Sequence, residues 1–363
     1  MLQELRIAFF SVLFAMLCLA FCSTAALAPL RPIAAEMESR DALIRAVSQL
    51  VENGGVDALD SLGVEFRDGE VRTRSGAWKL TLFYNAIEDV AARAGSDPQL
   101  ARRLLETIAA WRQAYPDHTA PVLAEAIAVT RLTIARGNAP SFQPVSLIPA
   151  SLIPVSLIED DDGQLVLRAL LLQLETHRAE LSVDPHAFVV TANVALATGA
   201  APGTVAEIIN SGIARHPGYY ALYFTAMDQL LKYEQPGPDK INAIAEKASE
   251  ATRVEEGFSL YARLMWHATS QTFGPRMIAS PKVDWQRMRL GIGDVLDRYP
   301  DPWNVNNFAY LACLAGDREV TVELLAQVGG EPIGEAWHNL AVYQRCVDWA
   351  KGSTSGNSGV KAK

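Results

Sequence analysis

Polar side chains that could act on anions or protons recur at helical spacing between positions 255 and 270. Glu256, Ser259, Arg263 and His267 lie three to four residues apart along the chain. On one continuous helix, residues at this spacing share a face. The sequence therefore predicts a helix over 255–270 with a single polar stripe.

Arg263 lies between two bulky residues of this predicted helix, Tyr261 and Trp266. An arginine buried among apolar side chains needs an acidic partner or a ligand. The first interpretation is structural. Arg263 would pair with Ser259 and Glu256 of its own helix, or with a carboxylate of a neighbouring helical hairpin, and would order the fold.

The second interpretation is functional, with Arg263 as a clamp for an anion or carboxylate of a bound partner. His267 and the rings of Tyr261 and Trp266 would then line the binding groove around it. An alternative function of another class, a hydrolase-type enzyme, would use a pocket around Glu256, Arg263 and His267.

No complete catalytic or cofactor motif accompanies the stripe. The chain has no glycine-rich phosphate loop and no Gly-x-Ser-x-Gly nucleophile elbow, and its six histidines include no pair at i, i+4 spacing. We therefore expect no catalytic residues, no metal site and no cofactor.

Charge and composition limit the partners further. Half of the 363 residues are apolar, so the chain can bury a sizeable core, and its net charge of -9 comes from dispersed acidic residues. A protein that binds a phosphate backbone needs a basic surface. We expect a protein or peptide partner and no nucleic acid.

Two of the four cysteines, Cys313 and Cys346, lie beyond the leader, on consecutive predicted hairpins. Two cysteines permit one bridge in an oxidising compartment, but free cysteines are also common buried residues. The sequence leaves both readings open.

The elements that must position these residues are helices. Apolar residues recur every three to four positions in nearly every segment after residue 36. Ala309 and Ala341 occupy the same small-residue position of two units about 32 residues apart, a spacing typical of stacked helical hairpins. The predicted fold is all-α, an array of tetratricopeptide-like (TPR-like) hairpins similar to an α-solenoid. One short β-hairpin over 63–74 is an expected exception, with a loop as its alternative.

Composition divides the chain into five regions. We expect a signal peptide or amino-terminal membrane anchor at 1–35, a helical lobe at 36–138 and a proline-rich pentapeptide-repeat linker at 139–162. A TPR-like repeat lobe at 163–351 and a flexible tail at 352–363 follow.

The first region indicates export. A basic residue precedes an apolar run that ends in small residues, as in a signal peptide. If it is not cleaved, the uncharged stretch 7–30 is long enough to span the roughly 30 Å of a bilayer's hydrocarbon. The protein is thus expected in the periplasm or anchored to the inner membrane, with no other membrane contact.

Several short motifs resemble those of a known family. They include Ala77-Trp78-Lys79-Leu80, Tyr261-Ala262-Arg263 with Trp266, Asp284-Trp285 and Tyr299-Pro300-Asp301. In these motifs the chain resembles bacterial TPR-like helical-repeat proteins of a family known only as a domain of unknown function. The resemblance covers most of 56–350 and implies a helical-repeat fold, with no activity attached. The function expected is binding of another protein or an envelope component, without catalysis.

Overall fold

The protein is described here by a computed structural model that covers residues 35–137, 163–233, 237–270, 274–278, 280 and 282–352. Over these residues the fold is all-α, which confirms the prediction of a helical-repeat protein. Almost all of the predicted leader, the whole 139–162 linker and almost all of the tail lie outside the described residues. None of the helices described is long and apolar enough to cross a membrane.

The amino-terminal lobe is a bundle of five helices in which α4 lies at the centre. Buried apolar residues on α4, Phe83 and Ile87 among them, contact the surrounding helices. The helices are α2 (Ala35–Asn53), α3 (Val56–Asp68), α4 (Lys79–Ala94), α5 (Pro98–Ala114) and α6 (Thr119–Gly137).

The repeat lobe continues from this bundle, because α6 packs against α8 and α10. From α10 onward, α10 packs on α11 and α12, α12 packs on α13 and α14, and α14 packs on α16, so the layers stack in sequence order. The first helices of this lobe are α8 (Gly163–Thr176), α9 (Arg178–Leu181), α10 (His186–Ala197), α11 (Pro202–Arg215), α12 (Tyr220–Tyr233) and α13 (Pro238–Glu256).

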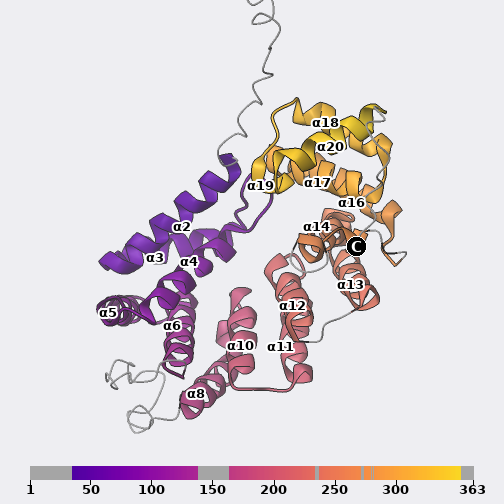
Figure 1. The fold of residues 1–363 in the computed structure, drawn as a ribbon. Helices are drawn as coiled ribbons and strands as arrows, with labels where there is room; N and C mark the ends of the chain where they lie inside the picture. The colour runs from indigo at the N-terminus through magenta and orange to yellow at the C-terminus, as the bar shows by residue number, and fades with distance from the viewer. Residues whose placement is uncertain are drawn as a thin grey trace, which may run out of the picture.

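The last part of the array carries clear capping signals. The carboxylates of Asp284, Asp301 and Asp317 each accept a backbone N–H in the first turn of the helix that follows. The helices are α14 (Ser259–Ala268), α15 (Pro275–Ile278), α16 (Trp285–Arg298), α17 (Pro302–Ala315), α18 (Arg318–Val328), α19 (Gly334–Trp337) and α20 (Leu340–Lys351). Figure 1 shows how the chain curves from the indigo helices through α8–α13 to the yellow ones.

The expected β-hairpin over 63–74 does not form. Residues 63–68 belong to α3, since Leu59, Gly63 and Phe66 are buried at helical spacing. The helix ends where the backbone N–H of Gly69 donates to the Glu65 carbonyl. Beyond it, strand-like pairing in the described residues is limited to one isolated bridge between Arg72 and Trp78. Tertiary burial of one helical face therefore outweighs the local alternation.

A bridge joins Cys313 of α17 to Cys346 of α20, with a Cα–Cα distance of 5.9 Å. The structure thus selects the disulfide over the free thiols. It ties α20 to the hairpin before it, where α17 also contacts α20 directly.

The segment between α3 and α4, residues 71–78, runs from the amino-terminal lobe to the array, and we call it the crossing segment (Figure 1). The Ser75 carbonyl accepts hydrogen bonds from Arg263 (2.7 Å) and Asn304 (3.1 Å). The Trp78 indole N–H donates to the Gly218 carbonyl at 3.0 Å. The two lobes are therefore joined by buried hydrogen bonds as well as by helix packing.

Candidate functional site

The predicted helix over 255–270 is two helices. It breaks at Gly257, which has a φ of +59° between α13 and α14. The break is held by Asp294 of α16, whose carboxylate accepts the Phe258 backbone N–H at 2.6 Å. Glu256 therefore ends one helix and Ser259 begins the next, so the single stripe does not exist.

Arg263 links two distant parts of the fold, and its partner differs from those that the first interpretation named. Its guanidinium donates to the backbone carbonyl of Ser75, far away in the sequence. It also lies over the Tyr299 ring, 5.3 Å from the centroid. Burial lowers the pKa of Arg263, while the nearby Tyr220 and Glu256 act in the opposite direction. No carboxylate within ion-pair distance of Arg263 is found among the described residues.

Tyr261 does not line a groove. Its side chain is fully buried, and its hydroxyl donates to Asn242 of α13 at 2.7 Å and accepts from the backbone N–H of Asp284 at 3.0 Å. Burial raises the pKa of Tyr261 to about 12. The residue joins α14 to its neighbours on the side away from Arg263.

His267 and Trp266 contact two other helices of the fold. The His267 imidazole Nε2 contacts the Asp228 carboxylate of α12, and its ring packs edge-on against Phe224. The Trp266 indole N–H donates to the Asn307 side chain of α17 at 3.0 Å. The four predicted binding residues therefore contact four different parts of the fold and do not form one clamp.

The residues expected around a hydrolase pocket have different neighbours. Glu256 lies near Tyr299, with a distance of 3.5 Å between the Tyr299 hydroxyl and the carboxylate, whereas His267 pairs with Asp228. Glu256, Arg263 and His267 line none of four cavities that lie among the described residues.

One of these cavities does contain a predicted residue, Trp266, and we call it the aromatic pocket. Its volume is about 200 Å³. Helix α14, the residues that follow it, α17 and α19 supply its walls. The lining residues are Trp266, Thr269, Ser270, Gly274, Trp303, Asn307, Tyr310, Leu311, Glu335, Ala336 and His338.

Neighbouring side chains hold two of the rings of the aromatic pocket. Asn307 accepts from the Trp266 indole N–H at 3.0 Å, and its amide donates to the Trp303 backbone carbonyl at 2.8 Å. Tyr310 packs against the buried Trp337, with ring centroids 5.6 Å apart. The three lining rings, those of Trp266, Trp303 and Tyr310, are each half-buried. The rings of Trp266 and Tyr310 are therefore held in position before any ligand arrives.

The rim of the aromatic pocket is polar. Glu335, His338 and Ser270 are exposed there. His338 has a φ of +61°, a region that non-glycine residues rarely adopt, and its ring packs edge-on against Tyr310. Strained backbone of this kind tends to gather at binding sites.

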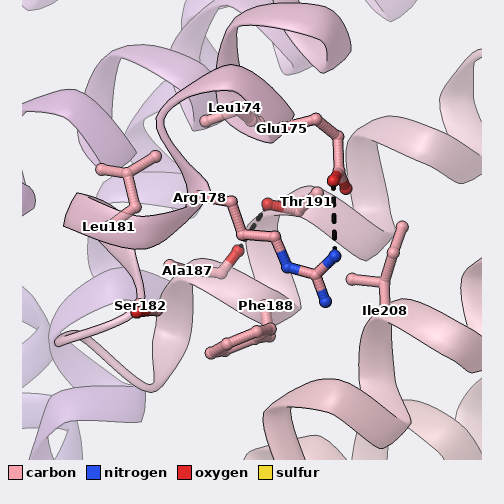
Figure 2. Close-up of a pocket in the computed structure, with 9 residues that line it drawn as sticks. All are labelled: Leu174, Glu175, Arg178, Leu181, Ser182, Ala187, Phe188, Thr191 and Ile208. Carbon is pink, nitrogen blue, oxygen red and sulfur yellow. Dashed lines mark hydrogen bonds and ion pairs between the residues drawn. The ribbon is translucent and has the colours of Figure 1, made fainter.

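A second cavity, drawn in Figure 2, is too small for an organic ligand. It holds about 10 Å³, room for one water molecule. Its charged residues are satisfied locally, because Arg178 pairs with Glu175 at 3.6 Å. The Thr191 hydroxyl donates to the Ala187 carbonyl within the same helix. A third cavity, of about 650 Å³, is an open trough that shares Glu175 and Arg178.

Among the described residues, no three His, Cys, Asp or Glu side chains come close enough together to bind one metal ion.

Sequence reasoning found Trp266 but missed Tyr310, Glu335 and His338 as its neighbours. The only available signal was the cluster of aromatic and asparagine residues at 303–310, which also reads as an ordinary helix start.

Comparison of the chain with protein-family models, with curated proteins and with solved structures gives no match. The resemblance to a helical family of unknown function therefore stays a prediction.

Proposed function

We propose that this protein is a non-catalytic helical-repeat protein that binds a polypeptide, and that its aromatic pocket receives a lysine or arginine side chain of that partner. The observation that carries the proposal is the lining of the pocket. Three rings, of Trp266, Trp303 and Tyr310, line a cavity with the exposed carboxylate of Glu335 at its rim.

This combination suits a cation. The faces of aromatic rings attract ammonium and guanidinium groups by about 0.5 to 2 kcal/mol per contact. Glu335 has no ion-pair partner among the described residues, so it is available to add a charge-assisted hydrogen bond at the rim.

The size of the pocket favours one side chain of a larger partner. Sites for free small molecules usually measure about 300 to 1,000 Å³, whereas the aromatic pocket measures about 200 Å³. The rest of the partner would lie along the array outside the pocket, as in other helical repeats.

The place of action is part of the proposal. Residues 1–35 have the composition of an export signal or an amino-terminal anchor. The partner would then be a polypeptide or another component of the cell envelope.

The test is selection of peptides from a random display library, followed by calorimetry with synthetic peptides. We expect selected peptides to carry a lysine or arginine whose replacement by norleucine weakens binding at least tenfold. Tyr310→Leu and Glu335→Gln should weaken the parent peptide to a similar extent. The matched control is Glu323→Gln, an exposed residue of α18 outside the pocket.

Two outcomes would refute the proposal. In the first, no selected peptide binds the purified protein. In the second, peptides bind, but the norleucine peptides and the two pocket variants retain full affinity.

A further inference from the structure

The fourth cavity is larger than the aromatic pocket and mainly apolar, and we call it the apolar cavity. It lies between the α10–α11 hairpin and the α12–α13 hairpin and has a volume of about 390 Å³. Its apolar walls include Leu196, Val205, Ile209, Ile213, Tyr223 and Leu230. This volume and this lining match those of ordinary ligand sites. The cavity contains no residue of the aromatic pocket.

Three polar residues also line the apolar cavity, namely Asn210, Gln229 and Lys247. The exposed ammonium of Lys247 donates to the neutral Asn210 side chain at 2.7 Å. No carboxylate pairs with Lys247 in the part of the chain that the structure describes. This cation therefore remains available to an anionic ligand.

Gln229 supplies a second, independent signal. Its carboxamide oxygen is buried and has no hydrogen-bond partner among the described residues. A buried acceptor without a partner destabilises a protein unless a donor reaches it. In a cavity with apolar walls, a ligand that carries an N–H or O–H group can be that donor.

We propose that the apolar cavity binds an N-acylated amino acid. The acyl chain would lie against the apolar walls, the amide N–H would donate to Gln229, and the carboxylate would accept from Lys247. Each group of this ligand matches one group of the cavity. A simple fatty acid anion has no donor for Gln229, and an uncharged lipid leaves Lys247 unused.

The probe is N-decanoylglycine, added to the full-length protein below its micelle concentration and measured by calorimetry. N-decanoylsarcosine is the matched ligand control, since it differs only by a methyl group in place of the amide hydrogen. Binding of the sarcosine compound should be about tenfold weaker, because Gln229 then receives no donor. Shortening the chain by two methylenes should weaken binding by a further factor of about ten.

The protein variants test the same contacts. Lys247→Gln should weaken N-decanoylglycine about tenfold, and Ala206→Phe, at the exposed rim of the cavity, should abolish binding. Gln229→Leu should remove the preference for glycine over sarcosine. Lys351→Gln, an exposed lysine at the end of α20, is the control and should bind like the parent. Circular dichroism verifies that each variant is folded.

Four results would overturn the proposal. They are the absence of binding heat, equal affinity for the glycine and sarcosine compounds, full binding by Ala206→Phe, and equal affinity for the uncharged N-decanoylglycinamide. Dimerisation of the protein that Ala206→Phe abolishes would instead assign the cavity to a second copy of the chain. The aromatic pocket takes no part in these measurements, so their failure leaves the proposed function untouched.

Discussion

His186 is the residue whose charge state is most strongly tied to folding. Its ring stacks on Tyr84 with centroids 4.3 Å apart, and its Nδ1 lies 2.7 Å from the Tyr219 hydroxyl. Asp184 accepts the backbone N–H of His186 and also the Tyr84 hydroxyl. Burial in this environment lowers the pKa of His186 from 6.5 to about 3. The folded protein therefore keeps this imidazole neutral.

This depressed pKa predicts a loss of stability in mild acid. Below pH 6.5 the unfolded chain gains a proton at His186 that the folded protein does not accept until about pH 3. The free energy of unfolding should therefore fall by about 1.4 kcal/mol per pH unit through this window. Urea unfolding from pH 7.5 to 5 measures the slope.

Variants assign that slope to one residue. His186→Gln removes the titrating group and should flatten the pH dependence, at some cost in stability at pH 7.5. His177→Gln is the control, because His177 is exposed on the surface. An unchanged slope in His186→Gln would show that other groups cause the acid sensitivity.

At the scale of the helices, the bridge between α17 and α20 should contribute to stability. Cys313 and Cys346 are 33 residues apart, and closing a loop of this length stabilises a fold by roughly 3 to 4 kcal/mol in the chain-entropy account. The double change Cys313→Ser and Cys346→Ser should lower the free energy of unfolding by that amount. Hydrogen exchange should locate the change at α20 first.

Reductant gives the control for this prediction. It should destabilise the parent protein as much as the double change does, and it should have no effect on the double variant. If the parent instead resists reduction and shows no free thiols when it is unfolded without reductant, the bridge has persisted. In that case the double variant alone tests the prediction. Equal stability of the variant and the parent would contradict the prediction.

Local signals in the sequence predicted the helices well but not the break at residue 257. The start of α17 carries a local signal, because the Asp301 cap and Pro302 both act within one turn. Gly257 is itself a local signal, because a glycine with positive φ commonly ends a helix. The contact that holds the break comes from Asp294 of another helix, and no local pattern shows that contact. Tertiary contacts of this kind also explain why the aromatic pocket was only partly predicted. Trp266 stood out by type, but Tyr310 and Glu335 join it only through tertiary packing.

For the molecule as a whole, Arg263 is the test of how firmly the two lobes are joined. Its hydrogen bond to Ser75 and its contact with the Tyr299 ring link the crossing segment to the array. Arg263→Ala should lower the free energy of unfolding by about 3 kcal/mol, because the change removes a charged donor to the Ser75 carbonyl and the contact with the Tyr299 ring. Thermal unfolding followed by calorimetry measures the loss.

Arg103→Ala, an exposed arginine of α5, should leave the melting temperature unchanged. If Arg263→Ala matches this control, the crossing segment does not depend on the guanidinium, and its bonds to Asn304 and Gly218 are enough to hold it.

The crossing segment also sets the order in which the protein can be completed. The hydrogen bond between the Ser75 carbonyl and Asn304 cannot form until Asn304 has been made, 229 residues later in the chain. A ribosome that adds about 5 to 20 residues per second needs roughly 10 to 50 s to make that stretch. Throughout this interval the nascent amino-terminal lobe lacks its final hydrogen-bond partner, so the two lobes can join completely only near the end of synthesis.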